Sequence, residues 1–236
     1  MSFTQPPEFD RLAENYESFF KPWLKLAGST REHFARARVI WLSKLLQNYG
    51  AAPRVVMDFG CGTGIAIPLL LELLAAQQVI GIDPSERSLD IARSSITSKR
   101  VSLGTMGDYS IEGQTDVVFC NGVFHHIGLA DRASAVEYIS RTLRAGGFFA
   151  LWENNPWNPI VRCAMKTTEL DKNAIAIPAP AARKLVQGHF NVIRTDYLFF
   201  FPAYLRGLFG VEKLLVQLPL GAQYQVLSQK KADSGD

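Results

Sequence analysis

The spacing of apolar residues divides the chain into a helical N-terminal part and a longer part in which short apolar runs alternate with helical patterns. Over residues 29–50 the apolar positions recur at helical spacing, with Ser29 or Thr30 as a candidate N-cap and Gly50 as the end. Residues 8–24 also carry a helical pattern. We therefore predict that residues 1–50 form a helical cap in front of a second unit.

From residue 54 onward, strand-like and helix-like segments alternate. The short apolar runs at 54–59, 79–83, 100–106, 115–124 and 148–153 predict strands, and the segments 65–78, 84–96 and 131–147 predict helices. Runs that are apolar throughout are typical of strands buried on both faces of a parallel sheet. The pattern predicts an α/β fold, a Rossmann-like three-layer sandwich.

The C-terminal part adds two segments that do not follow this alternation. We predict a helix at 179–188, strands at 195–201 and 223–230, and an apolar helical stretch at 203–218 between those strands. The second unit then spans residues 51–236, with insertions near 154–178 and 202–221. Such additions are candidates for binding an acceptor molecule.

Composition and charge exclude several classes of protein. The chain has 236 residues, of which 47% are hydrophobic, and its net charge of +3 comes from scattered basic residues, so binding to nucleic acid through charge is not expected. The N-terminus lacks a signal-peptide pattern, and no apolar run reaches about 18 residues. The widely spaced Cys61, Cys120 and Cys163 predict neither a disulfide framework nor a zinc site, and we expect a cytoplasmic protein.

The most informative stretch is VVMDFGCGTG, residues 55–64, where a strand turns into a helix. Glycines at such a turn let the backbone approach a ligand at the carboxyl end of a parallel strand. The spacing departs from the dinucleotide pattern G-x-G-x-x-G, because Ile65 stands where its third glycine would be. Asp58 also precedes Gly60 closely, and a carboxylate there disfavours a pyrophosphate and favours a ligand with an ammonium group.

A second acidic residue, Asp83, ends the strand at 79–83. A carboxylate at this place can accept hydrogen bonds from both hydroxyls of a ribose. Its alternative role is the N-cap of the helix at 84–96.

Four motifs together resemble the class I S-adenosylmethionine (SAM)-dependent methyltransferases. They are VVMDFGCGTG, GIDPS, TDVVFCNGVFHHI and LRAGGFFALWE, which cover about residues 54–153 in the order that this family has. The resemblance implies SAM as the cofactor, S-adenosylhomocysteine as its product, and a seven-stranded sheet whose final antiparallel hairpin falls on 195–201 and 223–230.

The resemblance also implies roles for individual residues. Asp58 lies near the methionine ammonium, and Asp83 holds the ribose. Cys61 is expected to be a small packed residue rather than a nucleophile. One of Asp108, Thr105 and Met106 is expected to contact the adenine amine. The implied cofactor-binding set is Asp58, Gly60, Cys61, Gly62, Gly64, Asp83, Pro84, Ser85, Thr105, Met106, Asn121, Gly122 and Val123.

Candidates for catalysis follow the fourth and fifth strands. His125 and His126 lie where the methyl group should be presented, and an imidazole of near-neutral pKa suits a general base, although packing and a solvated turn are the alternatives. Glu153 and Asn154 are expected to face the same pocket. No metal is expected, because the side chains of adjacent residues usually diverge and no third histidine or cysteine is near. Tyr16 is a candidate to close over the cofactor or to pack in the core.

The acceptor is the least determined feature. Aromatic residues in the additions favour an apolar or ring-bearing small molecule, and ENNPWNP with the C-terminal tail resembles bacterial methyltransferases encoded with glycan and lipid-linked sugar enzymes. The helix at 203–218 can act as a lid or contact a membrane surface. A SAM-binding module without activity and an RNA or protein methyltransferase are the alternatives, the latter opposed by CNGV at 120–123, where an NPPY-like tetrapeptide would stand. The oligomeric state is left open.

Overall fold

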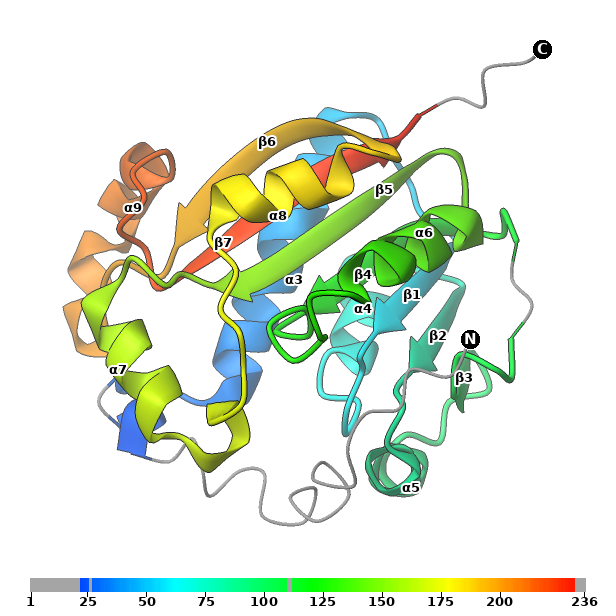
Figure 1. Ribbon diagram of the computed structural model, residues 1–236, viewed down its shortest axis with the longest axis horizontal. Helices are drawn as coiled ribbons and strands as arrows, with labels where there is room; N and C mark the ends of the chain where they lie inside the picture. The colour runs from blue at the N-terminus through cyan, green and yellow to red at the C-terminus, as the bar shows by residue number, and fades with distance from the viewer. Residues whose placement is uncertain (1–21, 26, 110–111, 232–236) are drawn as a thin grey trace.

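The computed structural model describes residues 22–25, 27–109 and 112–231, and Tyr16 therefore lies outside the described residues. A seven-stranded sheet runs in the order β3-β2-β1-β4-β5-β7-β6 (Figure 1). Every neighbouring pair is parallel except β5–β7 and β6–β7, which are antiparallel. The predicted fold class is thereby confirmed. The strands are β1 Val55–Phe59, β2 Gln78–Ile82, β3 Val101–Gly104, β4 Thr115–Asn121, β5 Leu143–Asn154, β6 Phe190–Leu198 and β7 Gln223–Lys230.

Helices cover both faces of this sheet. One core cluster joins the sheet to α3, α4 and α5, and the other joins it to α6 and α8 (Figure 1). α3 packs on α4, so the described part of the predicted N-terminal cap shares the core of the sandwich, and the boundary at residue 50 stays a prediction. The helical elements are α3 Arg31–Asn48, α4 Ile67–Leu73, α5 Glu86–Ser95, α6 Arg132–Thr142, α7 Pro159–Thr167, η2 Glu169–Asp171, α8 Ala179–Val186, η3 Ala203–Leu208 and α9 Phe209–Leu215.

The central strands alternate between the two cores. On β5, Phe149 and Leu151 pack in the cluster with α6 and α8, whereas Ala150 and Trp152 pack in the cluster with α3 and α4. Both faces of the strand are therefore apolar, which is why the sequence shows continuous apolar runs rather than alternation.

Several predicted bounds are wrong for identifiable reasons. The helix predicted at 131–147 ends at Thr142, because Leu143 is already extended and begins β5. Gly146, at φ +72°, lies within β5 where the pairing with β4 shifts register. The helix predicted at 65–78 spans only Ile67–Leu73, and Ala75 follows at φ +53°. β6 begins five residues earlier than predicted, at Phe190, and ends at Leu198, since Phe199 adopts φ +63°.

The insertion at 154–178 contains a helix that was not predicted. Asn158 caps α7 by accepting hydrogen bonds from the N–H groups of Ile160 and Val161, and Pro159 occupies the first turn. Asn155 ties this insertion to the C-terminal one through its Nδ2, which donates to the carbonyls of Pro219 and Gly221. The two predicted insertions therefore lie side by side at the carboxyl end of β5.

The helices in the described part of the chain are all too short or too polar to cross a membrane. Apolar side chains are nevertheless exposed along η3 and α9, among them Tyr204, Leu208, Val211 and Leu214. Contact of this segment with a membrane surface stays a prediction.

Candidate cofactor and acceptor site

The glycine turn follows β1 and supports a pocket at the point where the strand order reverses, between β1 and β4. Gly60, Gly62 and Gly64 all have positive φ, from +53° to +80°. A Cβ on Gly60 would lie 2.3 Å from Cγ2 of Val123, so this glycine lets the turn touch the segment after β4. A Cβ on Gly62 would meet no described atom within 4 Å, because this position faces the pocket.

Asp83 holds the glycine turn in place. Its Oδ2 accepts a hydrogen bond from the N–H of Gly62 at 2.8 Å, and its Oδ1 accepts one from the N–H of Ser85 at 2.9 Å. The N-cap of α5 is Ser85, whose Oγ accepts from the N–H of Ser88, and not Asp83, so the capping alternative is wrong. Each carboxylate oxygen can accept more than one hydrogen bond, which leaves acceptor capacity for ribose hydroxyls.

Two buried acceptors beside the turn lack a partner among the described residues. They are Oδ2 of Asp58, at the end of β1, and Oδ1 of Asn121, at the end of β4. Burial, with a further contribution from the charge of Asp83, raises the pKa of Asp58 from 3.8 to about 8. Unpartnered acceptors in a buried site favour a ligand that brings donors and positive charge. The amino-acid end of SAM, with its ammonium group, fits that requirement.

We call the cavity at this turn the glycine-turn pocket. Nine residues of the predicted cofactor set line it, and Ser88, Thr63, Ala66 and Phe119 join them. The nine are Asp58, Gly60, Cys61, Gly62, Asp83, Pro84, Asn121, Gly122 and Val123.

Gly64, Ser85, Thr105 and Met106 are not among the described residues that line this pocket. A Cβ on Gly64 would meet Cδ1 of Ile96 at 2.6 Å, Met106 packs against the core, and Thr105 is held by the carboxylate of Asp108. The contact of Asp108, Thr105 or Met106 with the adenine amine stays a prediction.

Cys61 lies beside the glycine-turn pocket and is buried. Burial, together with the charges of Asp58 and Asp83, raises the pKa of its thiol well above the ordinary value. A thiol in this state is a poor nucleophile, in agreement with a packing role.

A second cavity, the histidine pocket, adjoins the first. Arg31, Ile65, Asn121, Gly122 and His126 line both cavities. The remaining lining residues come from the N-terminal segment, the loop after β4, the ends of β5 and β7, and η2. They are Leu24, Phe34, Arg38, His125, Asn154, Leu170, Asp171 and Gln223.

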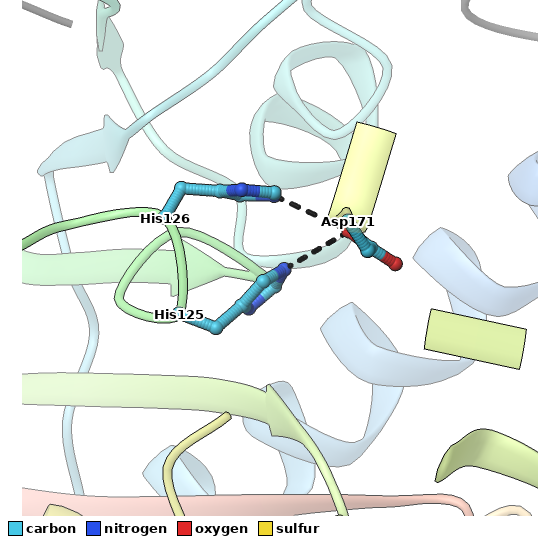
Figure 2. A group of neighbouring side chains, drawn as sticks. All are labelled: His125, His126 and Asp171. Carbon is cyan, nitrogen blue, oxygen red and sulfur yellow. Dashed lines mark ion pairs between the residues drawn. The ribbon is translucent and has the colours of Figure 1, made fainter. Parts of the chain in front are cut away.

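His125 is buried between two carboxylates. Its Nδ1 lies 2.5 Å from Oε2 of Glu153, and its Nε2 lies 3.5 Å from Oδ1 of Asp171 (Figure 2). Burial alone would lower the pKa of His125, but the charge of Glu153 and the contacts with both carboxylates outweigh it and raise the pKa from 6.5 to about 10. The imidazole does not have the near-neutral pKa that the sequence analysis expected of a general base.

His126 has the opposite electrostatics. Burial, followed by repulsion from His125, lowers its pKa from 6.5 to about 2, so the ring is neutral at pH 7. The expectation that the two side chains diverge is wrong, because their ring centroids lie 4.1 Å apart and Nε2 of His126 also lies 3.5 Å from Oδ1 of Asp171 (Figure 2). The turn after β4 permits this arrangement, which a regular strand would not.

Glu153 does not face either pocket, contrary to the expectation that it contacts the acceptor. It is fully buried, and its Oε1 accepts hydrogen bonds from the N–H groups of Val123 and Phe124. With Oε2 engaged by His125, the carboxylate fixes the turn after β4. Glu153 is therefore a positioning residue, which orients His125 and the turn after β4. Asn154, the next residue, does line the histidine pocket as expected.

Sequence reasoning missed four polar residues of the histidine pocket. Arg31 and Arg38 lie on α3, Gln223 begins β7, and Asp171 ends η2. Nε of Arg38 donates to Oε1 of Gln223 at 2.8 Å. None of the four belongs to a local motif, because α3, η2 and β7 are far apart in the sequence and meet only in the folded chain. The one available signal was that Arg31, Arg38 and Asp171 fall in predicted additions to the core fold.

The topology and the glycine-turn pocket define the class I SAM-dependent methyltransferase fold. Comparison with known proteins agrees, because residues 57–151 match the family described as a methyltransferase domain. Residues 57–151 therefore match a methyltransferase domain, a class of domain for which SAM is the cofactor, on a sheet with the topology of the class I fold.

Similar proteins include a trans-aconitate 2-methyltransferase of Acidovorax sp. (strain JS42), 28% identical over 147 residues, which are 60% of this chain and 56% of that protein. A malonyl-[acyl-carrier protein] O-methyltransferase of Priestia megaterium is 29% identical over 126 residues, 52% of this chain and 45% of that protein. The chain thus spans about half the length of these curated relatives.

Solved structures support the fold. A SAM-dependent methyltransferase from Thermotoga maritima superposes with a TM-score of 0.65 at 20% identity, covering 95% of this chain and 99% of that one. The geranyl diphosphate C-methyltransferase from Streptomyces coelicolor A3(2), solved with S-adenosylhomocysteine, gives a TM-score of 0.58 at 14% identity, covering 80% and 75%.

Proposed function

We propose that this protein transfers the methyl group of SAM to a small-molecule acceptor that carries an anionic group. The observation that carries the proposal is the junction of two pockets of opposite character. The glycine-turn pocket offers the acceptors of Asp58, Asp83 and Asn121, whereas the histidine pocket beside it holds the guanidinium of Arg38, and Arg31 lines both pockets where they adjoin. A cationic cofactor and an anionic acceptor would meet at the shared wall.

The chain's residues would hold SAM as follows. Asp83 accepts from the ribose hydroxyls, while Asp58 and Asn121 face the ammonium group, and the glycine turn lets the backbone pass close to the ligand. The sulfonium supplies an activated methyl carbon. The protein then has to align the acceptor with it and exclude water. His126, which lines both pockets, stands at the place of transfer.

The acceptor pocket favours a carboxylate or a phosphate. Guanidinium groups bind both through paired hydrogen bonds. Two curated relatives are named for anionic acceptors, trans-aconitate and malonyl-[acyl-carrier protein]. The proposal includes a sugar or lipid-linked acceptor that bears such a group. For the compartment we propose the cytoplasm, because Cys61, Cys120 and Cys163 are all free.

The first experiment is calorimetric titration with SAM, S-adenosylhomocysteine and NAD, followed by methyl transfer from labelled SAM to a panel of small carboxylates and phosphates. We expect the two SAM-type ligands to bind, NAD not to bind, and label to pass to at least one anionic small molecule. Binding of SAM without any transfer would favour the non-catalytic module. Label on RNA or on lysate protein would favour the macromolecular alternative.

A matched pair of variants tests the acceptor pocket. Arg38 lines the histidine pocket, whereas Arg36 lies on the same helix and forms an exposed ion pair with Glu72. Arg38→Gln is expected to raise the KM for the anionic acceptor about 10-fold, the loss of one charge-assisted hydrogen bond, with the Kd for SAM unchanged. Arg36→Gln is expected to leave both unchanged. Equal KM values in the two variants would remove Arg38 from acceptor binding.

A further inference from the structure

Three potential metal ligands converge at the wall of the histidine pocket. Nε2 of His125 and Nε2 of His126 each lie 3.5 Å from Oδ1 of Asp171, and the ligand atoms of the three residues lie within 4.8 Å of one another. Figure 2 shows both rings directed at the same carboxylate, with the histidines on the loop after β4 and Asp171 on η2. Segments far apart in the sequence thus bring two nitrogens and one oxygen to one point.

The distances suit a shared cation better than direct hydrogen bonds. A separation of 3.5 Å between each Nε2 and the Asp171 oxygen exceeds the usual length of an N–H···O hydrogen bond. In a tetrahedral site whose metal–ligand bonds are about 2.0–2.1 Å, ligand atoms lie roughly 3.3 Å apart. The two histidine–aspartate edges therefore already have nearly the length that a tetrahedral metal ion requires.

The surroundings of His125 fit the same role. Metal-binding histidines usually donate their other ring N–H to a carboxylate, which fixes the tautomer and aims the free nitrogen at the ion. Here Nδ1 of His125 contacts Oε2 of Glu153 at 2.5 Å, which leaves Nε2 toward Asp171. The N–H groups of Val123 and Phe124 hold Glu153 itself in position.

We propose that His125, His126 and Asp171 bind one divalent transition-metal ion, with Glu153 as the positioning carboxylate behind His125. Two imidazoles and one carboxylate select Zn²⁺, Fe²⁺ or Co²⁺ over Mg²⁺, which prefers oxygen ligands. Three protein ligands leave at least one coordination position open. All three residues line the histidine pocket, so the open position faces the space in which the acceptor is proposed to bind.

The charges of the pocket are consistent with such an ion. Asp171 and Glu153 are both buried and bring two carboxylates to the pair of imidazoles. A divalent ion there would also join Arg31 and Arg38 in attracting an anionic acceptor. This last point rests on the proposed function, whereas metal binding by the three side chains does not.

The test is titration of metal-free full-length protein with Zn²⁺ by calorimetry and with Co²⁺ by visible absorption. We expect one Zn²⁺ per chain and the d–d bands of a low-coordinate Co²⁺ site with nitrogen and oxygen ligands, and no stoichiometric binding of Mg²⁺. His126→Gln and Asp171→Asn are each expected to weaken Zn²⁺ binding at least about 10-fold. Loss of a residue that only hydrogen-bonds a metal ligand already costs about 10-fold, and loss of a ligand itself should cost no less. His189→Gln, at an exposed position remote from the pocket, is the matched control and should bind as the wild type does.

Calorimetric titration with SAM on the same samples separates this proposal from the proposed function. Asp171 does not line the glycine-turn pocket, so Asp171→Asn that binds SAM as the wild type does is folded, and its loss of Zn²⁺ and Co²⁺ binding supports the site. Because His126 lines both pockets, thermal unfolding rather than SAM binding is the folding control for His126→Gln. Wild-type protein that binds SAM but takes up no stoichiometric Zn²⁺ overturns the metal proposal and leaves the transferase standing. Equal Zn²⁺ affinity in wild type, His126→Gln and Asp171→Asn also overturns it, since the ion would then lie elsewhere.

Discussion

Asp58 should make the ligand-free protein less stable as the pH rises, and replacing it by asparagine should remove that dependence. The carboxyl is buried, its Oδ2 has no partner among the described residues, and burial with the charge of Asp83 raises its pKa from 3.8 to about 8. Because the pKa is higher in the folded than in the unfolded chain, the stability linked to the protonated carboxyl is complete below about pH 4. It is lost as the pH rises toward 8.

The size of the effect follows from the pKa difference. At 1.36 kcal/mol per pH unit, the unfolded state gains about 4 kcal/mol at pH 7 and about 5 kcal/mol at pH 8 by ionising this group, as upper values. Asparagine has nearly the same shape and does not ionise in either state. The free energy of unfolding of Asp58→Asn should therefore exceed that of the wild type by up to these amounts at pH 7 and 8, and by little near pH 4.

Urea unfolding at pH 4.5, 7 and 8, without cofactor, measures this difference. Asp116→Asn is a control in which the change in stability should have the opposite sign. Burial opposes ionisation of Asp116, but the N–H groups of Val55 and Arg54 and the guanidinium of Arg144 outweigh burial and lower the pKa of Asp116. That variant should lose stability at pH 7. The same Asp58→Asn protein should bind SAM more weakly, because the ammonium group loses its carboxylate. A difference between Asp58→Asn and wild type that does not grow with pH would refute the reasoning.

Two further predictions concern the glycine-turn pocket. Asp83→Ala should weaken SAM binding by about 1–3 kcal/mol, because charge-assisted hydrogen bonds are lost. Calorimetry should find no change in the control Asp90→Ala, which alters an exposed residue paired with Arg93. An unchanged Kd for SAM in Asp83→Ala would contradict the assignment of Asp83 to the ribose. In Gly62→Ala the new methyl group meets no described atom, so only the left-handed backbone at φ +53° should lower stability, by about 1–2 kcal/mol. The same methyl group would enter the glycine-turn pocket and should therefore weaken SAM binding. Gly60→Ala should unfold more readily, because its Cβ would lie 2.3 Å from Val123. Thermal unfolding and calorimetry of the two variants separate packing from ligand contact, and equal SAM affinity in Gly62→Ala and wild type would place Gly62 outside the binding surface.

The core of the fold could be predicted because its signals are local. Apolar runs buried on both faces and glycines between strand and helix identify β1, β2 and β4 without any long-range information. The signals for α7 were local too, since Asn158 and Pro159 are a usual N-cap and first-turn pair, but the density of asparagine and proline in this segment favoured a loop. Strand β5 was predicted too short because Gly146 and Gly147 normally end a helix, whereas here they lie within the strand.

The histidine pocket could be predicted only in part. His125 and His126 follow a strand at the end where ligands bind, and that position is visible in the sequence. Their ionisation is not, because the pKa of His125 depends on Glu153 and on Asp171 from a distant insertion, whereas the pKa of His126 depends on burial and on the charge of His125. The same two residues therefore have pKa values that are displaced in opposite directions.

The different charges that line the two pockets determine which ligand each pocket favours. SAM carries a net positive charge from its sulfonium, so the carboxylate of Asp83 favours it in the glycine-turn pocket, whereas Arg38 disfavours it in the histidine pocket. An anionic acceptor has the reverse preference. Ile65, Asn121, Gly122 and His126 form the uncharged part of the wall common to both, and Arg31 also belongs to that wall. The charges of Asp83 and Arg38, each of which lines only one of the two pockets, would thus direct each ligand to its own pocket, and the methyl group would pass at the wall that the pockets share.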